Sequence, residues 1–112
     1  IIEFLVAKTQ QLKIHHVYNY PNPFSTSTNF WFEHNQPSTK LNVLINIFTV
    51  SGKLVHQIQR SINSDGNRVN DIFWDGKDKF NQKLARGVYF YRIIVTSLFG
   101  QKAETTQKIY LL

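Results

Sequence analysis

Cysteine and methionine are both absent from this sequence of 112 residues. Without cysteine the chain has no disulfide, no thiolate nucleophile and no cysteine-ligated zinc, iron–sulfur or haem site. No apolar run approaches the roughly 18 residues of a membrane-spanning helix. The chain opens with Ile1 in place of an initiator methionine, from which we expect it to be a piece of a longer protein.

Acidic residues are also scarce, so the formal net charge is +6. The basic residues are mostly scattered singly, and the one close group, Lys77 to Arg86, has Asp75 and Asp78 beside it. A nucleic-acid-binding protein gathers its positive charge on one face or stripe. We therefore interpret the excess charge as solvated surface and expect no nucleic-acid partner.

Strand-forming residues dominate what is present, whereas alanine occurs only three times. Ile, Val, Leu and Phe make up 37 residues, enough for one core without a disulfide or a structural metal. No segment keeps a helical apolar stripe, and short apolar runs recur between turn signals. The pattern predicts an all-β protein, a seven-stranded Greek-key Ig-like β-sandwich. The strands are expected at Leu12–Tyr18, Thr28–Glu33, Leu41–Thr49, Leu54–Ile62, Val69–Trp74, Gly87–Thr96 and Lys102–Leu112.

Aromatic residues make up 14% of the chain and could form either a core or a contact surface. In strands that must fill a two-sheet core, we expect most of them to be buried. Trp31 lies between Phe30 and Phe32 in the predicted strand, so its side chain points to the opposite face of the sheet and is expected to be exposed. The predicted core aromatics are Phe30, Phe32, Phe48, Trp74 and Tyr89.

Catalytic and metal-binding chemistry is poorly supported. No Gly-x-Ser-x-Gly elbow occurs, and His15 and His16 are adjacent on a predicted strand, so they should point to opposite faces and share no ion. His34 and His56 are isolated and expected at the surface or half-buried. Asp71, Asp75 and Asp78 form the best carboxylate set, but bonding to their own turn backbone is favoured over a cation site.

Three ordered motifs carry more information than any single residue. The first is Tyr20-Pro21-Asn22-Pro23-Phe24, which follows the first strand. The second runs from Asn46 to Val55 across a hairpin. The third combines Trp74-Asp75-Gly76-Lys77-Asp78 with the segment from Leu84 to Ile93. The chain then closes with the basic-apolar strand Gln107 to Leu112.

Together these motifs resemble the bacterial Ig-like modules related to the flagellar hook-cap domain, which include the C-terminal sorting domains of type IX secretion. The resemblance spans Tyr18 to Leu112. The strand at Leu12 that runs into Val17–Phe24 resembles the C-terminal domain of the gingipain-like sortase of that system. It implies a sorting domain over residues 12–112, with residues 1–11 as a linker or the last strand of a preceding domain.

The resemblance assigns turn and core roles to part of the motif residues. Two prolines stop the first strand, and the glycines allow tight turns. Asn81 stands where the family commonly has glycine, and asparagine tolerates the left-handed conformation that such a turn needs. The residues with these structural roles are Pro21, Asn22, Pro23, Gly52, Trp74, Asp75, Gly76 and Asp78.

The function implied is that of a C-terminal secretion signal and docking domain, without catalytic residues, metal or cofactor of its own. It would direct a larger protein, the sortase itself, across the outer membrane to the cell surface. There an outer-membrane β-barrel shuttle protein (PorV-like) and other type IX components would bind it. As a hypothesis, a partner recognises an exposed strand edge and its apolar side chains. The residues assigned to this surface are Gly87, Val88, Tyr89, Tyr91, Lys108, Ile109, Tyr110, Leu111 and Leu112.

Several alternatives remain open. The domain could instead be the cleavable sorting domain of a cargo protein, a carbohydrate-binding module or a structural spacer. The segment from Lys108 to Leu112 could be a recognition element or only the strand that closes the fold. An exposed edge strand would also allow self-association.

Overall fold

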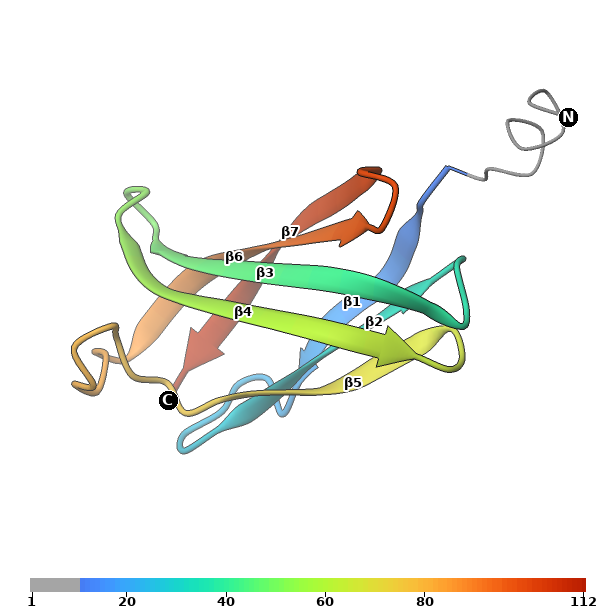
Figure 1. Cartoon of the computed structure of the whole chain (residues 1–112). Coiled ribbons are helices and arrows are strands. Elements are labelled where there is room, and N and C mark those ends of the chain that lie inside the picture. Colours follow the sequence, from blue (N-terminus) through green and yellow to red (C-terminus); the bar gives the residue numbers. More distant parts are fainter. Residues whose placement is uncertain (1–10) are drawn as a thin grey trace, which may run out of the picture.

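The computed structural model describes residues 11–112, which form seven strands in two antiparallel sheets (Figure 1). Every strand expected from Leu12 onward is present, with ends that differ by at most two residues from the prediction. The strands are β1 Ile14–Tyr20, β2 Thr28–His34, β3 Thr39–Thr49, β4 Leu54–Ser64, β5 Arg68–Trp74, β6 Gly87–Ser97 and β7 Lys102–Leu111. Residues 1–10 of the segment expected to be a linker or the last strand of a preceding domain lie outside the described residues. No described helix is long and apolar enough to span a membrane.

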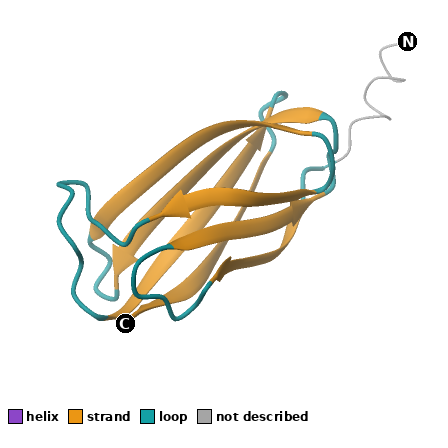
Figure 2. Cartoon of the chain, turned by 90° about the horizontal axis from the view of Figure 1, so that it is seen from below, coloured by secondary structure: helices purple, strands orange, loops and turns teal. Residues whose placement is uncertain are grey.

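The two sheets have the orders β1-β2-β5 and β4-β3-β6-β7 and pack as a sandwich (Figure 2). The chain changes sheet between β2 and β3, between β4 and β5, and between β5 and β6. These crossovers give the Greek-key arrangement of an Ig-like fold and confirm the predicted fold class. Figures 1 and 2 place the C-terminus at the opposite end of the sandwich from the first described residues.

The core forms where the inward-facing residues of both sheets meet. The alternation along β3 and β6 buries every second side chain, as a period of two requires. Trp74 is 2% exposed, which confirms it as a core residue. The side chains of these two strands that face the core are Leu41, Val43, Ile45, Ile47, Tyr89, Tyr91, Ile93 and Val95.

The burial of Phe48 and of His34 differs from the sequence-based assignment. Phe48 is half-buried on the outer face of the larger sheet, where the Arg92 guanidinium lies 5.8 Å from its ring centroid. Successive side chains of a strand point to opposite faces of the sheet. Phe48 follows the buried Ile47 in β3, so its side chain points to the outer face. His34 is 1% exposed, because its Nε2 lies 2.8 Å from the Ser64 hydroxyl and its Nδ1 accepts from the backbone of the next turn.

The turns follow the sequence closely. Gly52 closes the β3–β4 hairpin with φ of 94°, and its amide donates to the carbonyl of Thr49. Asn81 has φ of 65°, which confirms that asparagine supplies the left-handed conformation expected there.

Candidate functional site at the C-terminal strand

The outer edge of β7 is closed near the C-terminus by the loop that follows β1. The amide of Phe24 donates to the carbonyl of Tyr110 at 3.0 Å, and the amide of Leu112 donates to the carbonyl of Phe24 at 2.8 Å. The Asn22 side chain continues this pairing, since its Oδ1 accepts from the Tyr110 amide at 3.0 Å and its Nδ2 donates to the Lys108 carbonyl at 3.5 Å. We call Asn22 and Phe24 the edge clasp.

The clasp is held by the prolines and by a buried polar contact at their base. The Tyr20–Pro21 and Asn22–Pro23 peptide bonds are both cis. Neither proline has an N–H, so β1 ends here as the sequence predicts. Asn19 donates from Nδ2 to the Thr28 hydroxyl at 3.1 Å, and that hydroxyl donates to the Pro21 carbonyl at 2.8 Å. The loop is therefore anchored to the start of β2.

The Phe24 side chain packs among the other motif residues. It is 2% exposed, and its ring centroid lies 5.5 Å from that of Trp74. A Cβ at Gly76 would lie 3.2 Å from the Phe24 ring and 3.9 Å from the Leu111 side chain. Gly76 also has φ of 75°, so only glycine combines this backbone with this close approach. The separate sequence motifs thus meet around the end of β7.

The loop after Trp74 is stabilised by its own carboxylates. The Trp74 indole donates to the Lys77 carbonyl at 3.0 Å, and Asp75 accepts from the Lys77 amide at 3.2 Å. Asp78 accepts from the amides of Phe80 and Gln82, both at 2.9 Å. These contacts confirm that Asp75 and Asp78 bond turn backbone, which was favoured over a cation site.

The residues predicted to contact a partner separate into two sets. Tyr89, Tyr91, Ile109 and Leu111 are at most 8% exposed and belong to the core. Their side chains are not available to a partner of the folded domain. Val88, Tyr110 and Leu112 are 38%, 40% and 61% exposed, and Lys108 and Gly87 are exposed as well.

The two buried tyrosines differ in how their hydroxyls are accommodated. The Tyr89 hydroxyl donates to the Ala85 carbonyl at 2.7 Å, whereas the Tyr91 hydroxyl has no hydrogen-bond partner among the described residues. Burial raises the pKa of both phenols above the ordinary value, and much more strongly for Tyr91. Both side chains stay neutral at physiological pH.

The backbone edges exclude one form of recognition at this end. β6 pairs with β7 from Gly87 onward and with β3 from Tyr89 onward, so Tyr89–Tyr91 has no edge for an added strand. The clasp occupies the outer edge of β7 between Lys108 and Leu112. The strand-edge part of the recognition hypothesis is therefore wrong for Tyr89–Tyr91 and for Lys108–Leu112, and exposed side chains remain there as the means of contact.

On the outer face of the larger sheet, these exposed side chains are neighbours across the strands. Val88 pairs with Tyr110, and Phe90 pairs with Lys108 on one side and Phe48 on the other. We define Val88, Phe90, Lys108, Tyr110 and Leu112 as the C-terminal patch. Phe90 was missing from the sequence-based set, although its register beside Lys108 places it there.

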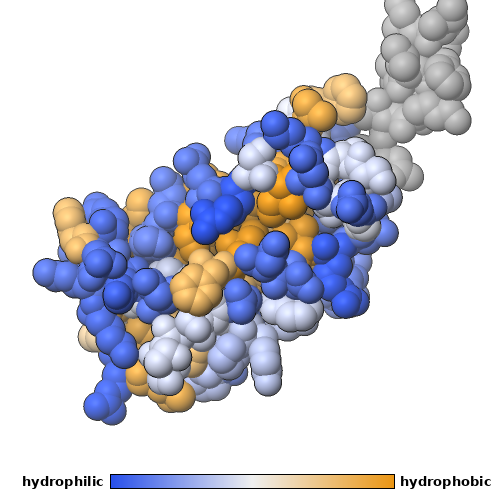
Figure 3. All heavy atoms as spheres, turned by 60° about the horizontal axis from the view of Figure 1, so that its bottom comes forward, coloured by the Kyte–Doolittle hydropathy of each residue, from blue (hydrophilic) through white to orange (hydrophobic). Residues whose placement is uncertain are grey.

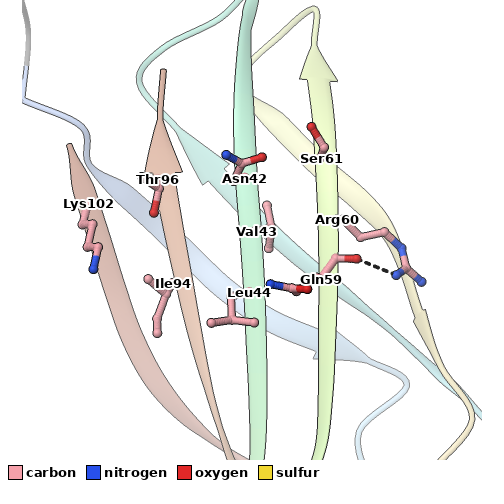
Figure 4. A pocket seen from close by; sticks show the side chains of 9 residues that line it. All are labelled: Asn42, Val43, Leu44, Gln59, Arg60, Ser61, Ile94, Thr96 and Lys102. Carbon is pink, nitrogen blue, oxygen red and sulfur yellow. Dashed lines mark hydrogen bonds between the residues drawn. The ribbon is translucent and has the colours of Figure 1, made fainter. Parts of the chain in front are cut away.

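Farther along the same face is an open depression of about 500 Å³ (Figure 4). Its floor is formed by Leu44 and Ile94, which are neighbours across β3 and β6. Polar side chains surround these two residues, and the Arg60 side chain donates to the Gln59 carbonyl at 2.9 Å. The depression lies on the same face as the C-terminal patch.

Comparison with known proteins now decides the family. The family model described as the secretion system C-terminal sorting domain matches residues 18–110. The chain belongs to this family of type IX sorting domains. No curated protein matches the chain.

Several solved structures share this fold. The sorting domain is similar to part of dimeric latent PorU from Porphyromonas gingivalis, with 29% identity, a TM-score of 0.79, and coverage of 94% of this chain but 10% of that one. FlgD from Xanthomonas campestris, described in the context of flagellar hook capping, shares the fold at 17% identity and a TM-score of 0.59, over 97% of this chain and 75% of FlgD. A Parabacteroides merdae β-glucuronidase shares it at 10% identity and a TM-score of 0.61, over 90% of this chain and 14% of the enzyme.

The sorting domain also has an aromatic surface that the sequence reasoning missed. Tyr18 stacks on Trp31, with ring centroids 5.5 Å apart and planes at 18°, and Trp31 is half-buried rather than exposed. Tyr20 and Phe73 are 67% and 52% exposed on the same outer face of the β1-β2-β5 sheet. Each of these aromatic residues occupies the outward-facing position of its strand, and that alternation is the signal in the sequence that could have revealed the surface.

Between β4 and β5 the sorting domain has a second depression, of about 360 Å³, lined in part by Ile58, Phe73 and Trp74. Figure 3 shows apolar side chains near the centre of the surface that it presents, bordered by hydrophilic ones.

The prediction that His15 and His16 point to opposite faces is wrong. The register of β1 against β2 shifts after His15, and His16 has φ of 51°. This bulge turns both imidazoles toward Glu33, with His15 Nε2 at 3.1 Å and His16 Nδ1 at 2.9 Å from Oε1. The hydrogen bond from His16, followed by the charges of His15 and Arg68, lowers the pKa of Glu33.

Proposed function

We propose that the sorting domain, besides acting as a type IX secretion signal, docks on an outer-membrane β-barrel shuttle protein of the PorV kind. The observation that supports this most is the C-terminal patch, where apolar and basic side chains of β6 and β7 lie together on the outer face of the larger sheet. The similarity to part of PorU, at 29% identity over 94% of this chain, supports the same role.

The edge clasp fixes the position of the strand that carries part of this docking surface. Because the edge of β7 is occupied from Lys108 to Leu112, the strand cannot rearrange without losing those bonds. The patch is thus rigid before binding, which reduces the conformational entropy lost on association. A partner would cover Val88, Phe90 and Tyr110 and place an acidic or polar group near Lys108.

A binding experiment tests this proposal. The variant Lys108→Glu with Tyr110→Ser changes exposed side chains only, so it should unfold at nearly the wild-type temperature. It should bind a purified PorV-like barrel about tenfold or more weakly, since truncating a hot-spot aromatic at the centre of an interface costs about 2 kcal/mol or more. The matched control is Tyr20→Ser with Phe73→Ser on the opposite sheet, which should bind normally. Equal binding by wild type and by the patch variant would refute docking through this surface.

We further propose that the parent protein is the sortase, which keeps this domain at the cell surface. An antibody against residues 11–112 would then detect the full-length parent in the surface fraction. Detection of the domain only as a fragment released from the parent would favour the cleaved cargo protein instead.

A second function, carbohydrate binding, is favoured by the aromatic surface formed by Tyr18, Tyr20, Trp31 and Phe73. Flat aromatic side chains on an exposed sheet are suited to stacking against sugar rings. Retention of the domain on a polysaccharide column, lost in Tyr18→Ala with Tyr20→Ala, would support this function. Elution of the wild type at the void volume would exclude it for that polysaccharide.

A further inference from the structure

A compact group of three metal-ligating side chains lies at the start of β1. His15, His16 and Glu33 each offer one ligand atom, and the three atoms lie within 4.8 Å of one another. Two of the separations, 3.1 Å and 2.9 Å to Glu33 Oε1, are close to those between ligands of one tetrahedral ion with bonds of about 2.0–2.2 Å. No other such group occurs among residues 11–112.

The backbone brings these residues together although two are adjacent in sequence. His15 is the register partner of Glu33 across β1 and β2, which sets the imidazole beside the carboxylate. The bulge that follows places His16 on the same side, with its ring centroid 4.9 Å from that of His15. Two successive strand residues therefore act as a pair on one face, which regular pleating does not allow.

The surroundings leave the group open on one side. Arg68 Nη2 lies 3.5 Å from Glu33 Oε2, so it engages one oxygen of the carboxylate and leaves Oε1 to the imidazoles. The side chains of His15 and His16 are 53% and 70% exposed. A metal ion could enter from solvent and would retain at least one position for water or for a group from another molecule.

We propose that His15, His16 and Glu33 bind a divalent first-row transition metal ion, with zinc as its representative. Two imidazole nitrogens and one carboxylate oxygen suit zinc, copper or nickel, whereas calcium and magnesium take oxygen ligands. The ion replaces the His16–Glu33 hydrogen bond and the His15–Glu33 contact, and it ties β1 to β2. Because the ligands bind as neutral imidazoles and a carboxylate, protons compete with the metal ion and affinity weakens as the pH falls.

Isothermal titration of the 112-residue chain with zinc chloride at pH 7.5 tests the proposal. We expect one zinc ion per chain, a higher unfolding temperature with zinc and weaker binding at pH 5.5. His16→Asn and Glu33→Gln should each weaken binding at least tenfold, since even residues that only orient metal ligands cost about 10–100-fold. His16→Asn is suitable because asparagine tolerates the left-handed backbone of the bulge. His56→Gln, which changes a distant histidine, should leave the affinity unchanged.

Each outcome decides the matter. Unfolding of the metal-free variants near the wild-type temperature ensures that a loss of binding reflects a lost ligand. Zinc-dependent dimers that disappear in His16→Asn support the site, with a second copy filling the open position. Absence of zinc binding, equal binding by Glu33→Gln, or calcium binding that matches zinc overturns the proposal.

Discussion

Removal of Lys108 to Leu112 should unfold the sorting domain rather than leave a folded domain without a signal. Ile109 is fully buried and Leu111 is 5% exposed, both within the single core. Truncating a buried Leu or Ile to Ala costs about 2–5 kcal/mol, so losing both costs about 4–10 kcal/mol. The clasp bonds of Phe24 to Tyr110 and Leu112 are lost as well, each contributing about 1 kcal/mol. A domain of this size has only about 5–15 kcal/mol of stability in total.

Near-ultraviolet circular dichroism and thermal unfolding of a chain ending at Gln107 measure this effect. We expect loss of the tertiary signal and no cooperative transition at 37 °C. Leu112→Ala is the control, because this side chain is 61% exposed and its backbone bond to Phe24 is retained. A truncated chain that unfolds cooperatively within about 5 °C of the full chain would show that β7 contributes less than about 1 kcal/mol at this end. That result would refute the argument from burial.

Three other predictions follow from single side chains and are checked by thermal or urea unfolding. Tyr91→Phe should raise the free energy of unfolding by about 1 kcal/mol, because it removes a buried hydroxyl that has no partner among the described residues. Tyr89→Phe should lower it by about 1 kcal/mol, because it removes a hydrogen bond. A change of the same sign in both variants would contradict this reasoning. Burial, and next the charge of His15, lower the pKa of His34 in the folded domain. The contribution of neutral His34 to stability is therefore complete above 6.5, the pKa in the unfolded chain, and is lost as the pH falls from 6.5 through the pKa in the folded domain. Melting curves from pH 8 to 5 should show this loss in wild type and a smaller one in His34→Gln. Gly76→Ala should destabilise by at least about 1–2 kcal/mol from its left-handed backbone alone, and an unchanged midpoint would contradict the close packing on Phe24.

Local patterns in the sequence predict most of the fold. The alternation of Tyr89, Tyr91, Ile93 and Val95 identifies the core face of β6, and Gly52 identifies the hairpin. Phe48 was assigned to the core because it is a large aromatic residue, although its position directly after the inward-facing Ile47 places its side chain on the outer face of the sheet.

The features that could not be predicted depend on contacts between distant segments. Nothing local in Asn22 shows that its amide will pair with the edge of β7, 88 residues later. The burial of His34 depends on Ser64 in another sheet. The bulge at His16 places a side chain that regular pleating would send to the other face, and no glycine marks the position.

The most direct test of the central claim is the export of a reporter fused ahead of this sorting domain in a bacterium with type IX secretion. The measured quantity is the fraction of reporter that protease can reach on intact cells. We expect the wild-type fusion and the Tyr20→Ser, Phe73→Ser control to reach the surface, and the Lys108→Glu, Tyr110→Ser fusion to stay inside although its domain is folded. Normal surface delivery of that patch variant would contradict the account.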